Sequence, residues 1–193
     1  MLAVPDREIA RSAAAIKPGP LVGHCSGATG LAVLAPHECF GLHPLMTFGR
    51  TPAVGVASPF EGAAAAVAGS SSRALAVATA LARQLGMETF ELADADRAAY
   101  HAAASIASNF LVTIEDAAEV VLRATGHDRR ILLPLIRATV DNWGDTGRTA
   151  LTGPVARGDE ETVAGQRAAI AERAPDLLAL FDVLVERTRA IAG

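Results

Sequence analysis

The sequence is poor in cysteine and in aromatic residues. Its 193 residues include 2 cysteines, and Phe, Trp and Tyr together make up 4% of the chain. Two cysteines are too few for a disulfide framework, and no Cys-x-x-Cys pair or Cys/His cluster has the spacing of zinc ligands. We therefore expect no metal site and a reduced, cytoplasmic setting.

Lysine is almost absent, and positive charge does not cluster. Lys17 is the only lysine, and the formal net charge is -4. An acidic balance without a run of Lys or Arg argues against a nucleic-acid-binding protein. The longest apolar stretches, such as residues 62–69 and 74–82, are far shorter than the roughly 20 residues that cross a membrane. No basic segment typical of a signal peptide precedes Pro5. We expect neither nucleic acid nor a membrane as a partner.

Several motifs that would name a reaction are missing. No Gly-x-Gly-x-x-Gly follows a predicted strand, and no P-loop is present. The two glycines of residues 27–30 have the wrong spacing for a dinucleotide fingerprint. Ser26 does not lie in the Gly-x-Ser-x-Gly pattern of a nucleophile elbow. The chemistry has to be sought in the order of the predicted elements.

The first ninety residues have an α/β pattern. The apolar residues 2–4 predict the end of a buried strand, and Asp6 begins a helical pattern with Ile9, Ala13 and Ile16 on one face. Residues 20–24 form a second short strand, so the segment is typical of a βαβ unit with parallel strands. Further strands are predicted at residues 41–48, 64–69 and 89–92, with a helix over 72–85 that ends at Gly86.

The rest of the chain is predicted to be all helical. One long helix begins at Asp94 or Asp96 and runs to residue 124, and a second covers residues 131–143. After a stretch rich in turns, Asp159 is a suitable N-cap for a third helix and Pro175 begins a fourth. The fold class we predict is therefore an α/β domain over residues 1–93 followed by an all-α domain over 94–193.

Polar residues and glycine follow two adjacent predicted strands. Ser26 and Gly27 come after the strand at 20–24, and His43 lies at the end of the next one. Open parallel sheets bind ligands at the carboxyl ends of their strands. A histidine beside a proline also serves often as a purely structural residue, and both readings stay open.

The long helix carries a polar stripe. At about 100° per residue, five short polar side chains fall within an arc of about 100°: His101, Ser105, Ser108, Asn109 and Asp116. The stripe is either a solvated face or the wall of a cleft. Short hydrogen-bonding groups suit the cleft better than open water.

The segment 151–159 also has two interpretations. Its glycines and Pro154 are typical of a turn, and Asp159 of a helix cap. Alternatively, Arg157 beside a helix N-terminus is suited to bind the carboxylate of a substrate. The residues favour neither interpretation over the other.

Five motifs in this order resemble a known family. They are Val4-Pro5-Asp6 with Ile9, His24-Cys25-Ser26-Gly27, Leu42-His43-Pro44-Leu45, Tyr100-His101-Ala102-Ala103-Ala104 with Asn109, and Thr152-Gly153-Pro154 with Arg157-Gly158-Asp159. The chain is similar to Rossmann-like proteins that carry a DUF2520 domain, within the 6-phosphogluconate-dehydrogenase-like superfamily. Ketopantoate reductase and pyrroline-5-carboxylate reductase are related to that family.

The resemblance implies an oxidoreductase that uses NADP or NAD. Residues 1–93 would form part of a Rossmann-like cofactor domain, and residues 94–193 a helical domain that binds substrate and forms a homodimer. Hydride would pass from NAD(P)H to a 2-oxo acid or related carbonyl, with a ketopantoate-like substrate favoured. The roles it implies are catalytic for His101, Asn109 and Ser105, cofactor binding for Pro5, Ser26, Gly27 and His43, and substrate binding for Arg157, Thr152 and Asp159.

Two departures from the family pattern shape a second hypothesis. Met1 falls where the family has its fourth strand, so we expect the glycine-rich phosphate loop to be absent. Gln166 stands where the family tends to carry a histidine. The alternative is a non-catalytic dimeric binding or scaffold protein that has lost dinucleotide binding.

Overall fold

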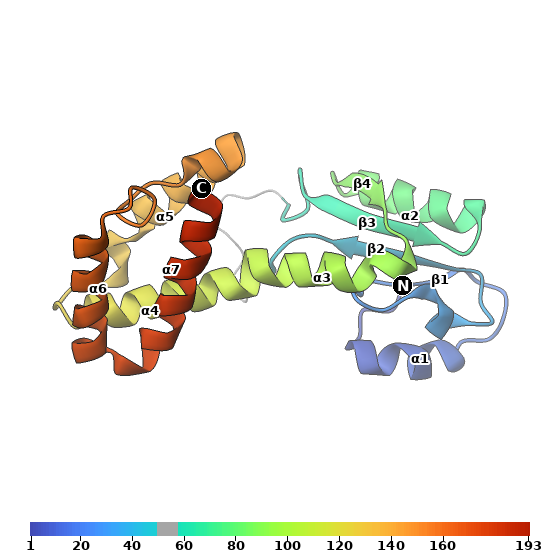
Figure 1. Cartoon of the computed structure of the whole chain (residues 1–193). Helices are drawn as coiled ribbons and strands as arrows, with labels where there is room; N and C mark the ends of the chain where they lie inside the picture. The colour runs from blue at the N-terminus through green and yellow to red at the C-terminus, as the bar shows by residue number, and fades with distance from the viewer. Residues whose placement is uncertain (50–57) are drawn as a thin grey trace. The chain divides into compact units, whose positions relative to one another are not determined.

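The computed structural model describes residues 1–49 and 58–193 (Figure 1). The chain divides into two compact units, residues 1–110 and residues 111–193. The domain boundary that we predict between residues 93 and 94 stays a prediction. The compact units divide later because α3 (Arg97–Ser105) packs against the sheet through Arg97 and Tyr100.

The first unit is built on a four-stranded sheet in the order β1-β2-β3-β4. The strands are β1 (Val22–His24), β2 (Cys39–Pro44), β3 (Ala64–Gly69) and β4 (Glu88–Glu91). β1 pairs with β2 in parallel and β3 with β4 in parallel, while β2 and β3 are antiparallel. The strand expected at residues 41–48 therefore begins two residues earlier and ends at Pro44.

The predicted βαβ unit at the start of the chain is confirmed, but its first strand is shorter than predicted. Leu2 makes a parallel bridge to His24, and its backbone N–H donates to the Gly23 carbonyl at 2.6 Å. Helix α1 (Asp6–Ala14) follows. The expected buried strand at residues 2–4 is only this one bridge, and Val4 is exposed.

Two helices cover opposite faces of the sheet (Figure 1). Ile9 and Ala13 of α1 pack with Val22 and Cys39 on one face. On the other face, α2 (Ser72–Gln84) buries an alanine every fourth residue, and these small side chains let the helix lie close to the strands. Because side chains alternate along a strand, Phe40 and Leu42 point to α2 and Cys39, Gly41 and His43 to the α1 side.

The long helix predicted from residue 94 to 124 has an irregular middle. A short 3₁₀ turn, η2 (Asp94–Asp96), leads into α3, which is followed by a π-helical segment, η3 (Ile106–Phe110), and then by α4 (Leu111–Arg123). The helical extent is as predicted, apart from the π segment. Regular α-helical spacing consequently does not hold across residues 106–110.

The second unit consists of helices, as predicted. They are α4, η4 (Arg129–Ile131), α5 (Leu133–Thr146), η5 (Gly147–Ala150), α6 (Glu160–Arg173), η6 (Pro175–Leu177) and α7 (Leu178–Ala192). α5 continues three residues beyond the predicted end and stops at Gly147, whose φ of +60° suits glycine. None of the helices in the described ranges combines the length and apolar character of a membrane span.

Candidate functional site

The carboxyl ends of β1 and β2 lie at the same edge of the sheet, because the two strands are parallel. The loop of residues 25–30 follows β1, and His43 lies near the end of β2. We call this place the β1–β2 edge. The predictions that put Ser26, Gly27 and His43 at one edge are confirmed by this pairing.

Two imidazoles converge beside Gly27. A β-carbon at residue 27 would lie 2.9 Å from Cδ2 of His101, 2.9 Å from Cε1 of His43 and 3.0 Å from its Nε2. The ring centroids of the two histidines are 6.2 Å apart. The structure therefore brings together three predicted site residues, and only glycine fits where they meet.

Tyr100 is a member of this site that sequence reasoning missed. Its hydroxyl oxygen lies 2.7 Å from Nδ1 of His43, and the two rings meet edge to face. Phe90 of β4 also packs against the tyrosine, with ring centroids 5.8 Å apart. The signals in the sequence are that it is the single tyrosine and that it begins the motif Tyr100-His101-Ala102-Ala103-Ala104, in which no role is predicted for the tyrosine.

Burial favours the neutral forms of both members of this pair. Burial lowers the pKa of His43, and the neighbouring positive groups His101 and Arg97 lower it further. Burial raises the pKa of the Tyr100 hydroxyl above its ordinary value. At neutral pH the pair is thus an uncharged phenol beside an uncharged imidazole.

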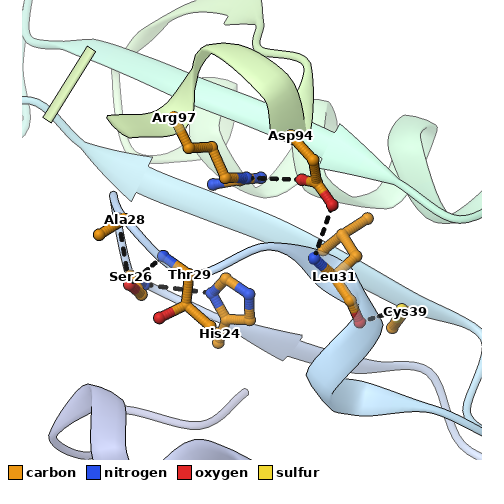
Figure 2. A network of polar contacts seen from close by, with 8 residues as sticks. All are labelled: His24, Ser26, Ala28, Thr29, Leu31, Cys39, Asp94 and Arg97. Carbon is orange, nitrogen blue, oxygen red and sulfur yellow. Dashed lines mark hydrogen bonds and ion pairs between the residues drawn. The ribbon is translucent and has the colours of Figure 1, made fainter. Parts of the chain in front are cut away.

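A polar network lies beneath the edge (Figure 2). Arg97 is 3% exposed, and its Nε donates to Oδ1 of Asp94 at 2.7 Å. The other oxygen of Asp94 accepts from the backbone N–H of Leu31 at 3.1 Å. A β-carbon at Gly41 would lie 3.1 Å from Nη2 of Arg97, so the absence of a side chain there leaves room for the guanidinium. The network ties the start of α3 to the sheet.

His24 is fully buried at the end of β1. Its Nδ1 accepts from the backbone N–H of Ser26 at 3.2 Å. Burial lowers the pKa of this imidazole, and the charge of Arg97 adds to that effect. His24 therefore stays neutral and supports the loop that follows it.

The hydroxyl of Ser26 shapes this loop. It donates to Oδ2 of Asp6 at 2.7 Å and accepts from the backbone N–H groups of Ala28 and Thr29 at 3.2 and 2.9 Å. Pro5 directly precedes Asp6 at the start of α1, so this contact also links Pro5 to the loop. Cofactor binding by Ser26 and Pro5 stays a prediction.

Ser105 and Asn109 lie farther along the same helical segment. Ser105 follows His101 by four residues, which corresponds to about 6 Å along the axis of α3, and Asn109 lies four residues further on, within η3. Ser105 is half-buried at the end of α3, and Asn109 is exposed within η3. Of the three predicted catalytic residues, His101 is the one that takes part in the convergence at Gly27.

The three predicted substrate-binding residues belong to the second unit. Asp159 caps α6, since its carboxylate accepts from the backbone N–H of Thr162 at 3.1 Å and from the Thr162 hydroxyl at 2.7 Å. Thr152 and Arg157 are exposed in the loop before it. The cap is as predicted, and a substrate-binding role for all three stays a prediction.

Comparison with known proteins identifies a family and two similar solved structures. The family model described as a domain of unknown function, DUF2520, matches residues 63–188. A crystal structure from Bacteroides fragilis, described as a candidate NADP oxidoreductase, has a TM-score of 0.83 at 22% identity and covers 97% of this chain and 73% of its own. A Thermotoga maritima protein structure has a TM-score of 0.81 at 27% identity, covering 98% and 76%. No curated protein matches the sequence. These structures confirm the predicted fold class.

Proposed function

Since the chain belongs to the DUF2520 family, as its motifs predicted, we propose that it is an NAD(P)H-dependent oxidoreductase. The substrate class is a 2-oxo acid or a related carbonyl compound, with a ketopantoate-like acid favoured. The observation that carries this proposal is the convergence of His43 and His101 beside Gly27. It lies at the edge where open α/β sheets hold ligands. The similar Bacteroides protein, described as a candidate NADP oxidoreductase, supports the choice of cofactor.

The residues at the β1–β2 edge suit the nicotinamide end of such a cofactor. Because Gly27 has no side chain, both imidazoles lie close to the backbone there, and a flat ring can lie beside them in this proposal. When bound, the reduced nicotinamide supplies the hydride. In this proposal Pro5, Ser26, Gly27 and His43 contact the cofactor.

The remaining residues act on the substrate. His101 is exposed and delivers a proton to the carbonyl oxygen, while Ser105 and Asn109 orient that oxygen by hydrogen bonds. Arg157 binds the carboxylate, because an exposed guanidinium near a helix N-terminus attracts an anion. Thr152 and Asp159 support that contact. A reduced, cytoplasmic setting is part of the proposal, and the free thiols of Cys25 and Cys39 agree with it.

The decisive experiment is a titration with NADPH followed by assays of NADPH oxidation with ketopantoate. We expect micromolar binding, and we expect His101→Ala and Asn109→Ala each to lower the rate at least about tenfold. His127→Ala and Asn142→Ala are matched controls in the second unit and should leave the rate unchanged. Absence of NADPH binding by the unmodified chain rules out the oxidoreductase, and unchanged turnover in both site variants rules out these catalytic roles.

A second candidate is a non-catalytic dimeric scaffold, and the second unit supports its dimeric part. Few of its residues are buried, while large apolar side chains are exposed along its helices. Among them are Val112 (68%), Leu135 (64%) and Trp143 (65%). Exposed apolar surface of this kind is typical of an interface. We propose that a second copy of the chain covers it.

Light scattering on the eluting peak of a sizing column tests the dimer. The unmodified chain should have twice the mass of one chain, and Leu135→Glu or Trp143→Glu should halve it. The exposed Thr149→Glu is a control that keeps the dimer. A monomeric unmodified chain contradicts the proposal, whereas a dimer that binds no NADPH favours the scaffold over the enzyme.

A further inference from the structure

The hydrogen bond between Tyr100 and His43 has no role in the function proposed above. We propose that Tyr100 is a positioning residue that donates to Nδ1 of His43 and so directs the Nε2–H of His43 toward a carbonyl-type oxygen of the ligand. The ligand part of this inference rests on the proposed function. The hydrogen bond and the position of the proton do not depend on it.

The backbone of α3 aims Tyr100 at the sheet. Arg97 lies three residues before Tyr100, so both side chains lie on the same face of the helix. Arg97 is held by Asp94 and packs against Gly41, which fixes the first turn of α3 over β2. His43 points to this same side of β2, two residues beyond Gly41. The hydroxyl oxygen of Tyr100 therefore lies 2.7 Å from Nδ1 of His43.

The groups around His43 decide which nitrogen carries the proton. His101 and Arg97 of α3 oppose a positive charge on the ring, and Asp6 of α1 favours one less strongly. A neutral imidazole has one donor and one acceptor nitrogen. The half-buried phenol keeps its proton and donates it, so Nδ1 is the acceptor and the proton of the ring lies on Nε2.

Nε2 faces the bare backbone at Gly27. A β-carbon there would lie 3.0 Å from this nitrogen, so any other residue would obstruct it. An uncharged N–H is a donor for a carbonyl or carboxamide oxygen. In the proposed reaction such an oxygen belongs either to the nicotinamide carboxamide or to the substrate carbonyl, and binding measurements distinguish these two sources.

The first test needs no ligand. Tyr100→Phe removes the hydroxyl and keeps the ring, and ¹⁵N NMR of the imidazoles reports the tautomer and the pKa of His43. In the unmodified chain we expect the proton on Nε2. In the variant we expect a tautomer mixture and a higher pKa, because a hydrogen bond to Nδ1 stabilises the neutral ring.

Two further measurements control this test. Phe90→Leu removes the ring that packs on Tyr100 but keeps the hydroxyl, and it should leave the tautomer unchanged. Tyr100 is the only tyrosine, so ultraviolet titration of the unmodified chain reports its ionisation alone. In His43→Ala the midpoint of this titration should be lower than in the unmodified chain, because the ring that packs against the phenol is missing. An identical His43 tautomer and pKa in Tyr100→Phe and the unmodified chain overturns the proposal.

The second test uses NADPH and ketopantoate with the full chain. If the carboxamide is the acceptor, Tyr100→Phe weakens NADPH binding about three- to tenfold, the effect of one misdirected hydrogen bond. If the substrate carbonyl is the acceptor, NADPH binding is unchanged and kcat/KM falls by a similar factor. If both values stay unchanged, the role toward the ligand is wrong. If the unmodified chain binds no NADPH, the proposed function fails and the ligand role with it, while the NMR result still decides the hydrogen bond.

Discussion

Gly27 shows how one missing side chain defines the β1–β2 edge. The imidazoles of His43 and His101 both lie within 3.0 Å of the position that a β-carbon would occupy. His43 is held by Tyr100, and His101 belongs to a helix anchored through Arg97. A side chain at residue 27 would therefore displace at least one of the two rings.

We predict that Gly27→Ala destabilises the protein by about 1–3 kcal/mol, the usual cost of overpacking. It should also weaken NADPH binding, since the rings must separate. Urea unfolding and the NADPH titration measure the two effects. The same substitution at Gly165, within α6 and with nothing near its β-carbon position, should stabilise by about 0.5–1 kcal/mol. Equal stabilities of the two variants would contradict this interpretation.

Buried His24 and half-buried His43 predict how stability depends on pH. His24 and His43 both have a pKa below the ordinary value of about 6.5. Below that pH the unfolded chain takes up protons that the folded chain does not bind, so stability should be lost as the pH falls from 6.5 through the lowered values. Melting curves between pH 8 and 5 measure it.

Substitution separates these histidines from the others. His24→Gln and His43→Gln should each make the melting temperature less sensitive to pH over this range. His127→Gln, at an exposed position, should retain the full dependence. A profile that stays the same in all three variants would assign the pH effect to other groups.

Sequence reasoning found some of these residues and missed others for a physical reason. Gly27 and His43 were predicted because a strand end is a local feature that the chain pattern displays. Tyr100 was named only as part of a family motif, and Arg97 resembles an ordinary surface residue of a helix. Arg97 is buried only because Gly41, in a distant strand, leaves space for it, and this contact is not visible in local periodicity.

Among the secondary-structure elements, α6 has the N-cap that the sequence predicts at Asp159, while a substrate-binding role for this residue is still a prediction. Asp159 was expected either to cap the helix or to bind substrate, and the structure confirms the cap through Thr162. Hydrogen bonds from Thr162 also lower the pKa of this carboxylate. The two roles respond differently to substitution.

We predict that Asp159→Ala lowers the melting temperature by about 2–4 °C, as expected for a lost helix cap in a chain of this size. Asp159→Asn keeps an acceptor for the Thr162 N–H and should restore most of that loss. Calorimetry compares the two. If the charge of Asp159 also orients Arg157 toward the substrate, both variants raise the KM for ketopantoate equally, and an unchanged KM restricts Asp159 to the cap.

The π segment limits what could be predicted from the long helix. The polar stripe from His101 to Asp116 assumes about 100° per residue throughout. Residues 106–110 wind more widely, so Asp116 no longer keeps the angular position that the sequence assigns to it. His101 and Ser105, which precede η3, keep their regular spacing. Intrinsic patterns predict that a helix exists better than they predict such irregularities.

At the scale of the whole molecule, the α/β to all-α order was predictable, and the direction of β3 was not considered. The parallel connection through α1 follows from its strand-helix-strand pattern. Apolar strands such as β3 fit a sheet in either direction. The direction of such a strand depends on which end of the sheet the preceding connection returns to, and the amino-acid composition does not indicate this.

The antiparallel pairing of β2 and β3 has a consequence for dividing the chain. The family match begins at Ala63, one residue before β3, while Phe40 and Leu42 of β2 lie outside it and cover the alanine face of α2. A fragment of residues 63–193 would therefore present an unpaired, apolar strand edge to solvent. We predict that this fragment aggregates on expression while residues 1–193 remain dispersed, measured by sedimentation. The family domain and the folding unit are thus different stretches of the polypeptide.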